Sequence, residues 1–250
     1  MVNINSVYQK VLALANKEQR GYITPQEFNL LADKAQLEIF ENYFHGIKMS
    51  EAKPKNQLDY ADELEMLEEK LHPFFTDQDV YTNTTNLTMP TDMYKIITIT
   101  RDGNQVTQLN KSQIAYTENN PLTKATFKRS VFVREDNSIV TLYPTPSSST
   151  YNWNTISSSN LSPSTLNDTE KLEINYYKKP TPPNWTYTVI NNKALFNASA
   201  ADLQHFELHG SEEEPLVYRI LMLAGFTTKQ PDLQQSGLGG IQLTKQEQNS

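Results

Sequence analysis

The side chains best suited to chemistry are His205, Glu207 and His209, because two imidazoles flank a carboxylate. In zinc proteases, two histidines four residues apart on a helix bind the metal, and the glutamate directly follows the first histidine. Here the glutamate comes two residues after His205, in a segment that we expect to be extended. Residues four apart on a strand are about 13 Å apart, too far to share one metal ion. We therefore expect no metal site, with Phe206 and Leu208 pointing inward and the three polar side chains facing solvent.

Other signatures of catalysis are missing from the sequence. It has no Gly-x-Ser-x-Gly motif, no phosphate-binding glycine loop followed by Lys-Ser/Thr, and no cysteine. Trp153 and Trp185 are candidates for stacking on a sugar, with ordinary surface packing as the plainer alternative. We accordingly predict that the protein is not an enzyme and needs no cofactor and no metal.

Bulk composition limits the possible partners. The 22 basic and 29 acidic residues give a formal charge of −7, and no Lys/Arg cluster stands out as a nucleic-acid footprint. An acidic channel would let DNA slide without tight phosphate contacts, although the charge is also explained by solubility alone. No apolar run approaches the roughly 20 residues that span a bilayer, and the N-terminus predicts no signal peptide, so we expect no membrane partner.

Helical periodicity covers about residues 4–75. Thr24-Pro25-Gln26-Glu27 combines a capping threonine, a proline at the first helical position and a capping-box glutamate. The helix that follows is apolar around most of its circumference, which predicts that it is covered on two sides, in a bundle or at a subunit contact. Its expected buried face comprises Phe28, Leu31, Ala35 and Ile39.

Two further helices are expected. One runs from about Tyr60 to Leu71 and has an acidic side that should face solvent or a channel. The other starts at a second capping box, Ser211 to Glu214, and ends near residue 228. The acidic side of the first comprises Glu63, Glu65, Glu68 and Glu69.

The pattern changes near residue 78 to short segments rich in Val, Ile, Thr and Tyr between turn residues, which predicts an antiparallel sandwich or barrel. The expected strands are Met93 to Thr100, Val131 to Val133, Ile139 to Tyr143 and Leu172 to Tyr177. Residues 147–167 are rich in Ser, Thr and Asn and predict an exposed loop.

The last residues, 229–250, alternate polar residues with four spaced aliphatic side chains. Four are too few to build a core, but they would anchor an extended peptide on another protein. The candidate partner-binding residues are Leu233, Leu238, Ile241 and Leu243.

Together these patterns predict an α+β fold. An N-terminal helical bundle, completed by a C-terminal helix, would carry an inserted antiparallel β sandwich or barrel and an extended C-terminal tail. The expected divisions are 1–77 for the bundle part, 78–210 for the β-rich domain, 211–228 for the C-terminal helix and 229–250 for the tail.

Several segments, in their order, resemble the adaptor of the phage head-to-tail connector, also called tail tubular protein A or first ring protein. The resemblance covers most of the chain except residues 147–167, and the opening is similar to structural proteins of marine and crAss-like phages. The segments are LTMPTDMY from Leu87, IVTLYP from Ile139, LEINYYKKP from Leu172 and FELHGSEEE from Phe206.

This resemblance implies a virion structural protein of the neck of a short-tailed phage, assembled in the host bacterial cytoplasm. Its subunits would form a ring, a dodecamer, below the portal protein and above the next tail or ring protein. Genomic DNA would pass the ring without sequence-specific binding, and the tail would reach into the portal.

An alternative remains a tail or receptor-binding module from the same kind of virion. The two tryptophans, the many tyrosines and the loop at 147–167 would then form a carbohydrate-contacting surface.

Overall fold

The computed structural model describes residues 1–17, 23–52, 58–80, 86–101, 103–136, 138–144, 172–191, 193–228 and 231–248. The chain divides into two compact units: a helical unit made of Met1–Phe74 with Pro180–Ser250, and a β unit made of Phe75–Lys179. The predicted α+β class is confirmed. Among the described residues, no helix is long and apolar enough to cross a membrane.

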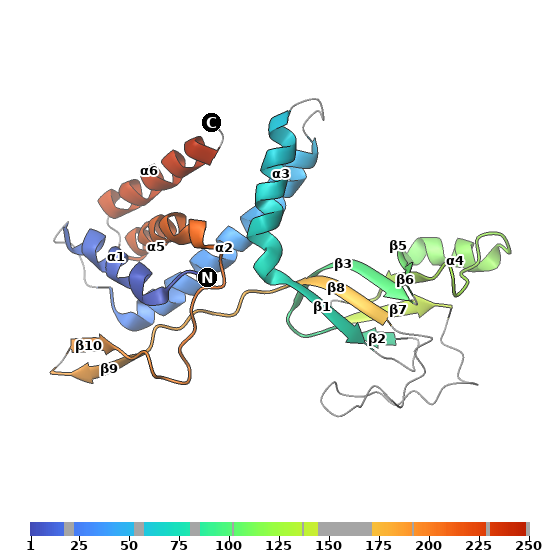
Figure 1. The fold of residues 1–250 in the computed structure, drawn as a ribbon, viewed down its shortest axis with the longest axis horizontal. Coiled ribbons are helices and arrows are strands. Elements are labelled where there is room, and N and C mark those ends of the chain that lie inside the picture. The colour runs from blue at the N-terminus through green and yellow to red at the C-terminus, as the bar shows by residue number, and fades with distance from the viewer. Residues whose placement is uncertain are drawn as a thin grey trace. The chain divides into compact units, whose positions relative to one another are not determined.

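The helical unit combines helices from both ends of the chain (Figure 1). Its helices are α1 (Ile4–Lys17), α2 (Pro25–Ala52), α3 (Leu58–Leu71), α5 (Glu213–Thr228) and α6 (Pro231–Gln248), with short 3-10 helices η1 (His72–Phe74) and η4 (Gly210–Glu212). It also holds the two-stranded hairpin β9 (Tyr187–Ile190) and β10 (Lys193–Phe196), so residues 180–210, which we expected in the β-rich domain, lie with the helices.

The capping box at the start of α2 is confirmed. The Thr24 backbone N–H donates to Glu27 Oε2 at 3.0 Å, and the Glu27 N–H donates to Thr24 Oγ1 at 3.3 Å. The Thr24 backbone N–H and hydroxyl, which both donate to the Glu27 carboxylate, hold the pKa of Glu27 below its ordinary value. The lowered pKa means that the charged cap stabilises the helix at neutral pH and is lost as the pH falls through that value.

The core face of α2 is confirmed at Phe28, Ala35 and Ile39, which are buried. Leu31 is only half-buried, so its assignment to the core is wrong. The core stripe instead runs through Ala32, one residue later, because the 3.6-residue repeat turns Leu31 toward the edge of the packed face.

The junction between η4 and α5 differs from the predicted capping box. His209 caps η4 by accepting the Ser211 backbone N–H at 3.3 Å, and α5 begins only at Glu213. Glu212 is buried and forms an ion pair with Lys70 of α3 at 2.8 Å. Burial, together with the negative charge of Glu212, raises the pKa of the Tyr43 phenol.

The acidic side of α3 faces solvent as predicted for Glu65, Glu68 and Glu69, which are exposed. The side chain of Glu63 lies outside the described residues.

The β unit contains two four-stranded sheets, ordered β1-β8-β3-β4 and β2-β7-β6-β5. All strand pairs are antiparallel except β5 with β6, which is parallel. The strands are β1 (Phe75–Val80), β2 (Asn86–Thr88), β3 (Met93–Arg101), β4 (Asn104–Gln105), β5 (Thr107–Leu109), β6 (Val131–Arg134), β7 (Ile139–Tyr143) and β8 (Leu172–Lys178).

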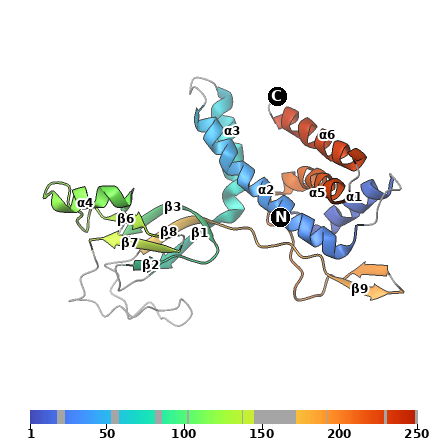
Figure 2. The same ribbon diagram turned by 180° about the vertical axis from the view of Figure 1, so that it is seen from behind.

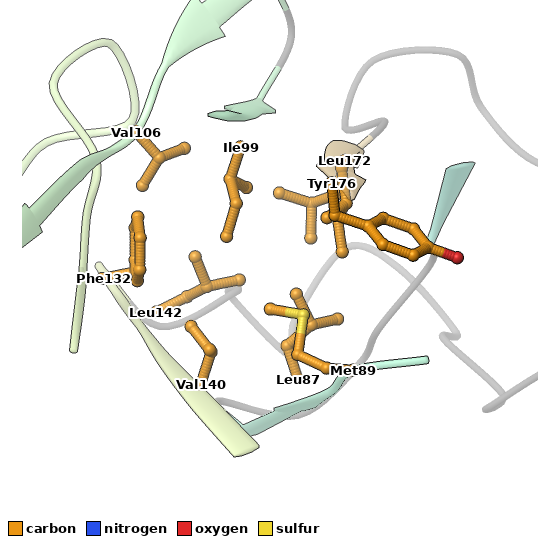
Figure 3. Close-up of a cluster of buried hydrophobic side chains, with 10 residues drawn as sticks. Leu87, Met89, Ile99, Val106, Phe132, Val140, Leu142, Leu172 and Tyr176 are labelled. Atoms are coloured by element: carbon orange, nitrogen blue, oxygen red, sulfur yellow. The ribbon is translucent and has the colours of Figure 1, made fainter. Parts of the chain in front are cut away.

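Side chains from both sheets meet in one apolar core, which confirms the predicted sandwich (Figure 3). Ile99 and Ile174 come from one sheet, and Phe132 and Leu142 come from the other. The Tyr176 hydroxyl donates to Asp92 Oδ1 at 3.2 Å at the margin of this core. Burial, with the Asp92 charge as a second cause, raises the pKa of Tyr176 to about 12. The 147–167 loop lies outside the described residues.

Helix α4 (Lys111–Asn119), between β5 and β6, was not expected from the sequence. Because β5 and β6 are parallel, the chain needs a crossover connection, which α4 provides. Figure 2 shows α4 beside β6 from behind.

The core assignment of α2 can be tested at two neighbouring positions. Phe28→Ala should lower the free energy of unfolding by about 3–5 kcal/mol, because Phe28 is fully buried. Leu30→Ala should change it by less than about 0.5 kcal/mol, because Leu30 is 75% exposed. Urea unfolding followed by circular dichroism measures both, and equal effects would contradict the assignment.

Candidate interaction surfaces

The predicted extended tail is wrong for residues 231–248, which form helix α6. Helix α6 runs alongside α5 in both ribbon views (Figure 1 and Figure 2). The physical reason is tertiary packing, which overrides the low helix propensity of a glycine-rich segment.

Two glycines allow α6 to approach α5 closely. A Cβ atom on Gly237 would lie 2.7 Å from the backbone nitrogen of Met222, and one on Gly240 would overlap the ring of Tyr218. Gly239, on the same helix, faces open space. The glycines at 237 and 240 therefore permit a close contact with α5 of the same chain.

The candidate partner-binding residues all lie on α6. Leu238 is 39% exposed, Leu243 is 63% exposed, and Ile241 is half-buried. The side chain of Leu233 lies outside the described residues. Helix α6 thus presents leucines at its surface instead of using all of them against α5.

The segment that looked most like a metal site is part of the helical core. Phe206 and Leu208 are buried as predicted, but Glu207 is also buried, so its assignment to solvent is wrong. Its carboxylate accepts the Thr181 backbone N–H at 3.0 Å and the Thr181 hydroxyl at 3.3 Å. Partners distant in sequence make this burial possible, and local periodicity gives no sign of them.

Gln36 of α2 completes this hydrogen-bond network. Its Oε1 accepts the Glu207 backbone N–H at 3.1 Å, and its Nε2 donates to the Thr181 carbonyl at 2.8 Å. The network joins α2 to two other segments. One contains Thr181, where the chain enters the helical unit, and the other contains Glu207, which precedes α5.

Both histidines accept backbone hydrogen bonds that stabilise the start of a helix. His205 Nδ1 accepts the Ile4 backbone N–H at the start of α1, at 3.3 Å, and His209 caps η4. In the part of the chain that the structure describes, no group of three His, Cys, Asp or Glu residues is placed to hold a metal ion.

Trp185 is 1% exposed, so it is not a sugar-stacking surface. Its ring stacks on Tyr187 and Phe196 at centroid distances of 5.7 and 5.9 Å, and its Nε1 donates to Asn5 Oδ1 at 3.2 Å. It anchors the β9–β10 hairpin to α1. Trp153 lies outside the described residues.

Comparison with known families identifies this architecture. A family model described as SU10 adaptor protein matches residues 57–224, more than half of the chain. The chain belongs to the SU10 adaptor protein family. It is therefore a bacteriophage structural adaptor and a component of the virion.

The matched span of this SU10 adaptor covers α3, the whole β unit and α5 as far as Ala224. Helices α1, α2 and α6 lie outside it. A search among curated proteins finds no match to the chain. The surface leucines of α6 thus belong to a part of the adaptor that the family match does not include.

The buried network predicts a specific loss on changing Gln36. Gln36→Ala removes the acceptor of the Glu207 N–H in a buried setting, which should lower the free energy of unfolding by about 2–3 kcal/mol. Gln26→Ala, at an exposed site on the same helix, should have little effect. Thermal unfolding compares the two, and a neutral Gln36→Ala would show that the network adds no stability.

The close approach of α6 to α5 predicts opposite effects at two neighbouring glycines. Gly237→Ala should reduce amide hydrogen-exchange protection along α6, because its Cβ meets the Met222 backbone. Gly239→Ala should raise protection, because alanine is favoured over glycine by roughly 1 kcal/mol in a helix and the site is open. If both substitutions raised protection, α6 would not pack on α5 as described.

Proposed function

We propose that this adaptor forms a closed homo-oligomeric ring, a dodecamer, in the neck of a short-tailed phage of the crAss-like or marine kind. The ring would lie below the portal and above the next tail or ring protein, as the head-to-tail connector. The single observation that carries this proposal is the match to the SU10 adaptor family over residues 57–224. Assembly would take place in the host bacterial cytoplasm.

Exposed apolar side chains support the formation of a ring. Leu30 and Met49 of α2 and Met66 of α3 are large apolar side chains exposed on the helical unit. A subunit that is covered by its neighbours in a ring would bury such side chains. Head-to-tail contacts between identical subunits close into a ring when the rotation between them fits.

Docking on the portal is assigned to α6. Its exposed leucines, Leu238 and Leu243, offer apolar contacts to a partner that packs around the helix. One such helix gives a weak contact, and a ring that presents many copies at once supplies avidity. The proposal thus keeps the expected partner but changes the docking element from an extended peptide to a helix.

The genome would pass through the ring without sequence-specific binding. A subunit charge of −7 keeps attraction to phosphates low, so DNA would slide and not adhere. We assign the protein no catalytic step. The segment most like an active site, around Glu207, instead forms structural hydrogen bonds to Thr181 and to Gln36 of α2.

The role of α6 can be tested with a matched pair of double variants. Leu238→Ser with Leu243→Ser should weaken attachment to portal-bearing heads at least about tenfold, because each leucine loses apolar burial worth on the order of 1 kcal/mol. Gln242→Ser with Gln246→Ser changes exposed polar positions of the same helix and should leave attachment unchanged.

Co-sedimentation of purified adaptor with heads measures the attachment, and circular dichroism checks that all variants fold. Equal attachment by the leucine variant and the original chain would remove α6 from the docking surface. Loss in both variants would assign docking to the polar side of α6 instead.

A further inference from the structure

The connection between β5 and β6 carries a helix that is exposed on most of its surface. Helix α4 has no buried residue, although a helix of nine residues is not stable in water by itself. It is held at its N-terminal end: the Asn110 N–H donates to Gln113 Oε1 at 3.1 Å, and Lys111 forms an ion pair with Glu135. The sandwich therefore fixes α4 through its start and through a half-buried side that includes Ile114, Thr117 and Glu118, and it leaves the other side exposed.

Apolar side chains are displayed on α4 and on the chain that follows it. Tyr116 is 81% exposed and Leu122 is 83% exposed, and Phe127 is also exposed. Leaving three large apolar side chains in water in one short segment is unfavourable for an isolated subunit. This is the pattern of a surface that a partner covers.

Internal contacts hold the backbone at Leu122 and Lys124 and the ring of Phe127. Arg129 Nη2 donates to the carbonyls of Leu122 and Lys124 at 2.9 and 3.2 Å. The guanidinium of buried Arg101 lies 4.6 Å from the ring centroid of Phe127. A surface that is already ordered loses less entropy on association.

The same segment is basic in an acidic protein. Residues 119–134 include four basic side chains and no acidic one, whereas the whole chain has a charge of −7. Lys124 and Lys128 are exposed, and neither forms an ion pair within the described residues. We call Tyr116, Leu122, Lys124, Phe127 and Lys128 the α4 patch.

A complementary surface exists on α3 of the helical unit. Glu65, Glu68 and Glu69 are exposed, and the thioether side chain of Met66 is exposed next to them. Positions three and four apart share one side of a helix, so these residues form a continuous strip. We call them the α3 acidic face. It offers carboxylates and one apolar side chain to a partner with ammonium groups and apolar side chains.

We propose that the α4 patch of one subunit binds the α3 acidic face of a second copy of this chain. The contact rests on the proposed ring and would be its repeating head-to-tail joint. The two surfaces differ, so each subunit uses one for each neighbour, which is the arrangement that generates a ring. Leu122 and Tyr116 would contact Met66 and the stems of the glutamates, while Lys124 and Lys128 pair with the carboxylates.

Paired charge reversals test this joint. Lys124→Glu with Lys128→Glu (the patch-reversed adaptor) and Glu65→Lys with Glu68→Lys (the face-reversed adaptor) should each weaken self-association at least about tenfold, because attraction becomes repulsion. Lys34→Glu with Lys193→Glu changes the net charge by the same amount as the patch reversal, at exposed sites elsewhere, and should assemble normally. Native mass spectrometry and sedimentation measure assembly of the purified chains, alone and with portal-bearing heads.

The decisive sample is an equal mixture of the two reversed adaptors. Every contact between unlike subunits is then attractive again, so the mixture should recover assembly to within about threefold, with the two variants in equal numbers. Failure of the mixture to recover, or normal assembly by either reversed adaptor alone, would overturn the joint.

Two further results separate this inference from the proposed function. If the original chain forms no ring even with portal-bearing heads, the proposed function itself is wrong. If the patch-reversed adaptor assembles normally but loses affinity for a short DNA duplex, the α4 patch is a nucleic-acid surface and the joint is refuted.

Discussion

The helical unit depends on the buried network of Gln36, Glu207 and Thr181. Its helices come from both ends of the chain, separated by the whole β unit, so the chain entropy of bringing them together must be offset by contacts that are distant in sequence. Glu207 makes such contacts, because its carboxylate and its N–H both find partners. A buried carboxylate without these partners would cost several kcal/mol, so the network disfavours arrangements that separate these segments. Glu207 lies shortly before α5, so the network also fixes where α5 begins, and α6 follows α5 in the chain.

Local signals in the sequence were sufficient for much of the fold. The Thr24–Glu27 capping box, the β6–β7 hairpin and the exposed acidic side of α3 each follow from residues that are close in sequence. Features that depend on distant partners were missed. The burial of Glu207 does not follow from the local pattern, because its partners are more than twenty residues away in the sequence. The helical form of α6 does not follow either, because its glycines disfavour a helix until it packs against α5.

Other elements were within reach of the sequence. The β9–β10 hairpin turns at Asn191, which has a φ of 51°, and paired asparagines between two β-rich segments are a turn signal.

Helix α4 has no apolar periodicity in its sequence, because none of its residues is fully buried. The candidate docking residues Leu238 and Leu243 are at the surface, as a partner-binding role requires, but on a helix and not on a peptide. Among the described residues, α6 and α4 both expose apolar side chains that the fold of the subunit does not cover.

The central claim is that this SU10 adaptor forms a ring between the portal and the rest of the tail. Cryo-electron microscopy of the virion neck tests it most directly. The account predicts a ring of copies directly below the portal, with α6 of each subunit against the portal. Density for the chain at the tail tip or on tail fibres, with another protein filling the position below the portal, would contradict it.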